Sequence, residues 1–169
     1  SSGKQGYEIA LALSKLGIKT TLITGPTSLI HKKEIITKKI LTAAEMLKVV
    51  KRSLPVDIAI CTAAVADFKP VKTYKKKLKK DLINLKSMSL EKNKDIVEYL
   101  AKNNKHRPSL VVGFSAETEN LTKNALSKLK AKNCDLIVAN DVSKKNVGFN
   151  SDYNKVTIID SNGKIKSFK

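Results

Sequence analysis

Short apolar runs separated by helical patterns constrain the fold of this chain more than any other feature. Three such runs occupy residues 58–64, 110–114 and 134–139. Each is too short for a typical helix and is mostly apolar, as expected of strands that are buried on both faces of a parallel sheet. A helical spacing of apolar residues at 120–132 separates the second run from the third. The alternation predicts an α/β, Rossmann-like fold with a mostly parallel sheet and helices on both faces.

Local signals mark the ends of further elements. Gly17 follows a helical pattern and is placed to end that helix. Thr42 and Glu45 form the sequence signature of a capping box, whose helix continues to about Ser53. Asn162-Gly163 predicts the turn of a C-terminal β-hairpin at the edge of the sheet. The other expected elements are helices over 6–16 and 93–103, strands over 20–24, 35–40 and 83–87, and a lysine-rich loop over 69–81.

Length and composition favour one domain over residues 1–169. With 169 residues, of which 41% are hydrophobic, the chain can bury a core. No apolar run approaches the roughly 18 residues of a membrane span, and no secretory signal pattern is visible. Cys61 and Cys134 both lie in apolar runs and fit no zinc-binding spacing. Two buried free thiols in a reducing compartment indicate a cytoplasmic protein.

The net charge of +18 raises the question of nucleic-acid binding. Only Arg52 and Arg107 among the 33 basic residues are arginine, the residue whose planar fork pairs best with phosphates and guanine edges. The lysines are scattered over predicted helix surfaces and loops instead of forming a stripe. The charge therefore favours small polyanions such as triphosphates over nucleic acid.

The end of the first apolar run has the composition of a nucleotide site. Ala64 and Ala66 are small, so a ligand can approach the backbone where open α/β sheets bind ligands. Asp67 follows them and can hold a ribose hydroxyl or a metal ion. Lys77 and Lys80, in a run of lysines ten residues on, can close over phosphates.

Other predicted strand and helix ends add weaker candidates. Ser2, Gly3 and Gly6 open the first helix, where backbone N–H groups can meet an anion; a simple helix cap is the alternative. Phe114 can stack on a ring or pack in the core. Asn140 and Asp141 can contact a ligand or serve turn chemistry. No Ser/His/Asp arrangement or nucleophilic cysteine stands out.

Nine stretches of this sequence occur together in a recognisable order: 1–6, 25–26, 42–46, 63–68, 77–80, 92–96, 112–118, 135–143 and 148–152. Together they resemble the phosphopantothenoylcysteine synthetase family, the ligase domain of the bifunctional coenzyme A biosynthesis proteins and of the DNA/pantothenate metabolism flavoproteins. The resemblance implies that CTP and Mg²⁺ convert 4′-phosphopantothenate to an acyl-cytidylate with release of pyrophosphate. The amine of cysteine then attacks, giving phosphopantothenoylcysteine and CMP.

The resemblance also implies roles for individual residues. Lys77 matches the family's catalytic lysine, which stabilises charge on the α-phosphate or acyl group, and Lys80 lies in the same motif. The other matches are Ser2, Gly3 and Gly6 at the triphosphate, Ala64, Ala66, Asp67 and Phe114 around the nucleoside, Asp95 at ribose, metal or substrate, and Asn140 and Asp141 at the substrate.

Family members are commonly homodimers and are often fused to a phosphopantothenoylcysteine decarboxylase, which has no counterpart in these residues. The family also has a strand and an asparagine-bearing segment before the motif that starts this chain, and a helix after its last strand. We therefore expect the ligase domain to be incomplete at both ends and the functional protein to contain residues upstream of Ser1. Lys94 stands where proline is common in the family.

Two other classes of function remain as alternatives. A dinucleotide-binding oxidoreductase module would share the fold, but no complete Gly-x-Gly-x-x-Gly follows a strand, and the strand over 20–24 ends in Gly-Pro without an acidic residue. A lysine-rich nucleic-acid-binding protein is the third class. Selective binding of CTP would oppose both.

Overall fold

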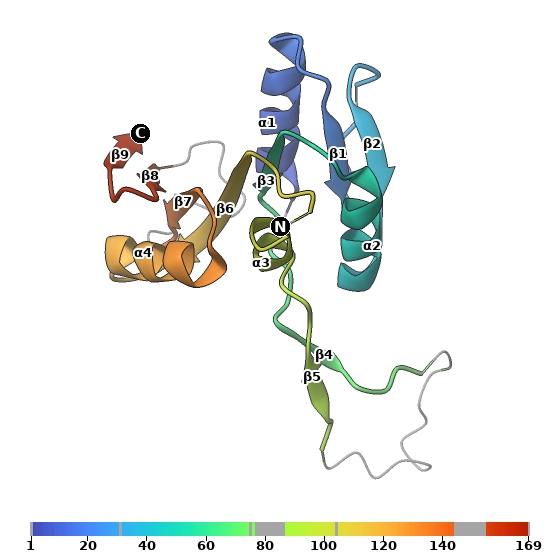
Figure 1. Cartoon of the computed structure of the whole chain (residues 1–169). Helices are drawn as coiled ribbons and strands as arrows, with labels where there is room; N and C mark the ends of the chain where they lie inside the picture. The colour runs from blue at the N-terminus through green and yellow to red at the C-terminus, as the bar shows by residue number, and fades with distance from the viewer. Residues whose placement is uncertain are drawn as a thin grey trace.

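A five-stranded sheet forms the larger part of the fold (Figure 1). The computed structural model of the chain describes residues 2–30, 32–74, 76, 87–103, 105–143 and 155–168. The strand order is β3-β6-β7-β8-β9, with β3, β6 and β7 parallel and the last two strands antiparallel. This arrangement confirms the expected Rossmann-like class and its hairpin at the edge. The strands are β3 (Ile58–Cys61), β6 (Leu110–Glu117), β7 (Leu136–Asp141), β8 (Val156–Asp160) and β9 (Ile165–Phe168).

A separate parallel pair, β1 (Thr21–Thr24) and β2 (Ile36–Lys39), lies beside α1 (Lys4–Lys15) and α2 (Ala43–Ser53). Within the described ranges, β1 is hydrogen-bonded only to β2, and β3 only to β6. The expectation that residues 58–64 form a strand buried on both faces is therefore wrong. The strand ends at Cys61, and Ile58 is 43% exposed, because an edge strand has a neighbour on one side only. The expected additional strand upstream of Ser1 stays a prediction.

The local signals in the sequence correspond to real helix and turn ends. Thr42 caps α2 through its side chain, which accepts from the Glu45 N–H at 3.1 Å, and the Glu45 carboxylate accepts from the Thr42 N–H. Gly17 and Gly163 have φ angles of 76° and 80°, in the left-handed region that favours glycine. The capping box and the hairpin turn are thus confirmed.

Helices α3 (Ile96–Ala101) and α4 (Leu121–Lys132) pack against the five-stranded sheet. α3 is shorter than the predicted helix over 93–103. The fully buried side chains of Val111, Ile137 and Ile159 come from three neighbouring strands and form the centre of the core with α4. None of the helices in the described residues is long and apolar enough to cross a membrane.

A two-stranded ribbon projects away from the rest of the chain (Figure 1). It consists of β4 (Phe68–Pro70) and β5 (Leu90–Lys92), paired antiparallel with Phe68 opposite Lys92. The prediction of a lysine-rich loop over 69–81 missed β4. The strand expected over 83–87 falls mostly outside the described residues, and Ser87 is not in a strand. Exposed apolar side chains gather on the ribbon and its described continuations: Phe68, Val71, Tyr74, Met88 and Leu90.

Candidate nucleotide and substrate site

The carboxyl ends of β3, β6 and β7 bring several predicted site residues to one edge of the sheet. Ala64, Ala66 and Asp67 follow β3 and are exposed, while Phe114 in β6 is half-buried. The register pairs Cys61 with Gly113 and Ala116 with Asn140, so these strand ends lie side by side. The carboxyl edge of a parallel sheet is where ligands bind in open α/β folds.

The start of α1 lies against the end of β3. A Cβ added to Gly6 would sit only 2.7 Å from Thr62 Oγ1, so no larger residue fits there without a shift. Gly3 caps α1 with a φ angle of 75° and offers no side chain to its amides, although the Ser2 hydroxyl accepts from the Lys4 N–H at 3.4 Å. The first turn has no acidic residue. A hydrogen bond from Thr27 Oγ1 to the Ser2 carbonyl oxygen, 3.0 Å long, fixes the backbone of Ser2. This geometry leaves the N-terminal amides of α1 suited to an anion next to β3.

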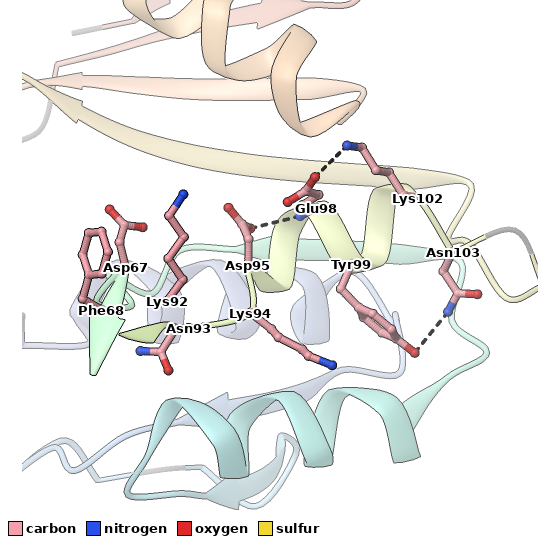
Figure 2. Close-up of a pocket in the computed structure, with 10 residues that line it drawn as sticks. All are labelled: Asp67, Phe68, Lys92, Asn93, Lys94, Asp95, Glu98, Tyr99, Lys102 and Asn103. Atoms are coloured by element: carbon pink, nitrogen blue, oxygen red, sulfur yellow. Dashed lines mark hydrogen bonds and ion pairs between the residues drawn. The ribbon is translucent and has the colours of Figure 1, made fainter. Parts of the chain in front are cut away.

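A cavity of about 860 Å³ opens beside Asp67 and runs along α3 (Figure 2). It brings together Asp67 and Asp95, two of the predicted site residues. Three lysines and two asparagines are among the other residues that line it. The lining residues are Asp67, Phe68, Lys92, Asn93, Lys94, Asp95, Glu98, Tyr99, Lys102 and Asn103.

The Asp95 carboxylate caps the start of α3 and also forms an ion pair. One carboxylate oxygen accepts from the Glu98 N–H at 3.0 Å, and the other lies 3.0 Å from Lys132 Nζ. Burial on its own would raise the pKa of Asp95, but these two interactions outweigh it and keep the pKa below the ordinary value. Lys132 is a member of the site that sequence reasoning missed, because no local pattern connects α4 to residue 95.

Asn93 links the cavity to the small-residue segment. Its side chain donates to the Ala66 carbonyl at 2.8 Å, and its backbone N–H donates to the Asp67 carbonyl at 2.8 Å. These bonds fix the backbone that carries the candidate nucleotide site. No sequence signal indicates them, since the partners are 27 positions apart.

The end of β7 contains an unsatisfied acceptor and lies near an ion pair of which only the carboxylate is buried. Asn140 Oδ1 is buried and has no hydrogen-bond partner in the described part of the chain, so it can accept from a ligand. Glu117, at the end of β6 and opposite Asp141, lies 2.6 Å from Lys128 Nζ. Burial would raise the pKa of Glu117, but the Lys128 hydrogen bond and charge lower it below its ordinary value.

The last residue of β3, Cys61, carries a free thiol. Its burial, followed by the nearby charge of Asp95, raises its pKa to about 12. Burial also raises the pKa of Cys134, and both cysteines are free. A thiol that stays protonated is a poor nucleophile, so neither cysteine is suited to covalent catalysis.

Lys77, Lys80 and the stretch 148–152 lie outside the described residues, so their roles stay predictions. In the ranges that the structure covers, no group of three His, Cys, Asp or Glu residues could hold a metal ion. Since both Asp95 oxygens are engaged, Asp67 is the cavity's more available carboxylate. One carboxylate fits Mg²⁺ only as an ion carried on substrate phosphates, its usual form of binding.

The parallel strands, the α1 terminus and the cavity at the carboxyl edge define a Rossmann-like α/β protein with a candidate ligand site. Residues 1–169 match the family described as DNA/pantothenate metabolism flavoprotein C-terminal domain, and the chain belongs to that family.

The relatives found include two bacterial proteins named coenzyme A biosynthesis bifunctional protein CoaBC. The protein from Borreliella burgdorferi is 42% identical over 161 residues, 94% of this chain, and that from Bacillus subtilis is 41% identical over 165 residues, 96% of this chain. This chain spans about 40% of the length of either relative.

Solved structures agree with the fold. The crystal structure of the C-terminal domain of a CoaBC protein is 34% identical, with a TM-score of 0.78 over 100% of this chain and 74% of that chain. A Cab2 mutant in complex with phosphopantothenate-cysteine has a TM-score of 0.73 over 100% of this chain and 72% of that chain. At 14% identity, the Cab2 likeness shows the fold alone.

Proposed function

We propose that this chain is a phosphopantothenate–cysteine ligase domain of coenzyme A biosynthesis. CTP activates the carboxylate of 4′-phosphopantothenate as an acyl-cytidylate and pyrophosphate leaves. The amine of cysteine then displaces CMP and forms the amide. The observation that carries the proposal is the family match over residues 1–169, together with about 40% identity to CoaBC proteins over nearly all of this chain.

The geometry supports a nucleotide across the edge of the sheet. Ser2, Gly3 and Gly6 would meet the triphosphate at the start of α1, whose first turn has no acidic residue. The nucleoside would lie at the end of β3, where the exposed Ala64, Ala66 and Asp67 allow close backbone contact. Phe114 would form one wall. A larger purine would crowd these walls, so CTP is the proposed nucleotide.

The substrate would meet the end of β7. Asn140 Oδ1, which has no hydrogen-bond partner among the described residues, offers an acceptor for an amide or hydroxyl donor of the pantothenate chain, with Asp141 beside it. Mg²⁺ would neutralise the triphosphate and favour departure of pyrophosphate. Asp95 stays the weaker candidate for metal or ribose, because its oxygens already bind Glu98 N and Lys132. Lys77 and Lys80 would act on the phosphates.

A homodimer is part of the proposal. The exposed apolar side chains of the β4–β5 ribbon, among them Phe68 and Leu90, would be covered by a second copy. Association or fusion with a phosphopantothenoylcysteine decarboxylase is proposed from the bifunctional relatives. A cytoplasmic location is proposed with it, supported by two free cysteines.

The test is product analysis by mass spectrometry with the intact protein. Incubation with CTP, Mg²⁺, 4′-phosphopantothenate and cysteine is expected to give phosphopantothenoylcysteine, CMP and pyrophosphate. Calorimetry is expected to show tighter binding of CTP than of ATP. Binding of NAD in preference to either triphosphate would favour the oxidoreductase alternative, and absence of amide product would reject the ligase.

A further inference from the structure

Lys132, in the last turn of α4, reaches a residue of the cavity without lining the cavity itself. Its Nζ atom lies 3.0 Å from one Asp95 carboxylate oxygen, while the other oxygen accepts from the Glu98 N–H at 3.0 Å. The side chains of Lys132 and Asp95 are only 34% and 29% exposed. Two helices therefore engage both oxygens of Asp95 and hold this carboxylate at the start of α3 (Figure 2).

The charge of Lys132 changes the electrostatic balance of the cavity. The lining contains three carboxylates, on Asp67, Asp95 and Glu98, and three lysines. These charges cancel, so the described lining by itself offers a polyanion no net attraction. Lys132 adds one positive charge next to Asp95 and makes the sum over these described groups positive.

The ion pair also lies close to the end of β3, whose continuation carries the candidate nucleotide site. Burial raises the pKa of the Cys61 thiol to about 12, the charge of Asp95 adds to this rise, and the charge of Lys132 opposes it. Both charges therefore act at the last residue of β3, shortly before Ala64. At such a partly buried place, salt and water screen an uncompensated carboxylate less than they do at an exposed position.

We infer that Lys132 is a positioning residue for the triphosphate nucleotide and that it acts through Asp95. It holds the carboxylate against α3 and cancels its charge, so that a polyanion can occupy the cavity edge beside Asp67. The inference rests on the proposed ligase function, which puts the nucleotide at this edge. An ion pair that only joined α4 to α3 would affect folding and leave the affinity for a nucleotide unchanged.

The experiment measures CTP binding in the presence of Mg²⁺ by calorimetry, with the intact protein. It compares wild type with Lys132→Met, Lys132→Arg and the matched control Lys130→Met, an exposed lysine in the same last turn of α4. Lys132→Met is expected to raise the Kd for CTP about fivefold at low salt, because the Asp95 carboxylate then repels the phosphates. Lys132→Arg keeps the charge and is expected to stay within about twofold of wild type. Lys130→Met is expected to match wild type.

Two further measurements distinguish a charge effect from a loss of packing. At each salt concentration Lys132→Met is compared with wild type, and its deficit is expected to shrink between about 0.05 M and about 0.5 M salt, because salt screens the repulsion. The double variant Lys132→Met with Asp95→Asn is expected to recover most of the affinity at low salt, since asparagine removes the charge and can still cap α3. A deficit that neither change relieves would overturn the inference.

The wild-type protein separates this inference from the proposed function. If it neither binds CTP nor releases pyrophosphate from CTP and 4′-phosphopantothenate, the ligase proposal fails and the inference fails with it. If wild type binds CTP and Lys132→Met binds it equally well at low salt, only the inference is overturned.

Discussion

Arg107 and Asp135 form an ion pair in which a single guanidinium nitrogen, Arg107 Nη2, lies 2.9 Å and 3.1 Å from the two carboxylate oxygens. The same guanidinium donates to the carbonyls of Ala101 and Pro108 at 2.8 Å, and Asp135 Oδ2 accepts from the Val111 N–H at 2.7 Å. One residue therefore connects the end of α3, the approach to β6 and the start of β7.

We expect Arg107→Ala to lower the free energy of unfolding by about 2–3 kcal/mol, because it removes the arginine donor from a partly buried carboxylate and from the carbonyls of Ala101, Pro108 and Asn133. Urea unfolding followed by circular dichroism measures the change. Arg52→Ala, at an exposed position in the last turn of α2, is the matched control and is expected to change stability by less than about 0.5 kcal/mol. Equal effects of the two substitutions would contradict this role of Arg107.

Gly6→Ala is expected to weaken CTP binding about tenfold, a loss of roughly 1.4 kcal/mol. The new methyl group would lie 2.7 Å from Thr62 Oγ1 and push the start of α1 away from β3. The double variant Gly6→Ala with Thr62→Ala removes the clashing hydroxyl and is expected to recover most of the affinity. Calorimetry of CTP with Mg²⁺ measures both. An unaltered affinity in the single variant would mean that the α1 terminus does not contact the nucleotide.

Glu117→Gln is expected to reduce stability at neutral pH by about 1 kcal/mol, with the deficit disappearing in acid. Burial acts to raise the pKa of Glu117 in the folded protein, but the hydrogen bond and the charge of Lys128 outweigh burial and lower the pKa. Its stabilisation is complete above the ordinary value of 4.5 and is lost as the pH falls through the folded pKa. Urea unfolding at pH 7 and pH 3 tests this. Glu91→Gln, in an exposed pair with Lys69, should have little effect at pH 7.

Lys77→Gln is expected to abolish most acyl-cytidylate formation while CTP still binds. A single positive charge aimed at the transition state affects the rate more than the ground-state affinity. Pyrophosphate release and CTP calorimetry, both in the intact protein, give the two quantities. Turnover within about twofold of wild type would mean that the barrier is essentially unchanged and that Lys77 is only solvated charge.

Local sequence chemistry identified those elements whose signals lie within a few residues. The capping box of Thr42 and Glu45 needs only a three-residue spacing, and the hairpin turn at Gly163 needs only one residue with positive φ. The ribbon was missed because β4 and β5 are three residues each and depend on pairing between Phe68 and Lys92. Such a long-range register leaves no periodic trace in the sequence.

The residues of the candidate site also fall into those that local sequence identifies and those that only tertiary packing brings together. Small residues after a strand indicated Ala64, Ala66 and Asp67 directly, because the carboxyl edge of a sheet is a general ligand position. The ion pair of Lys132 with Asp95 depends on how α4 packs beside α3. The hydrogen bond of Asn93 to Ala66 depends on β5 running back along β4 to the segment that precedes it. These contacts arise from tertiary packing.

Asn93 connects the β4–β5 ribbon to the backbone of the candidate nucleotide site. Because it bonds the carbonyls of Ala66 and Asp67 directly beyond the end of β5, any displacement of the ribbon acts on the backbone beside the candidate nucleotide. A partner on the ribbon that favours one position of this backbone would change the affinity for a ligand at Asp67. Thermodynamic linkage requires that the ligand change the affinity for that partner by the same factor. Assembly and ligand binding would then be coupled through a single free energy.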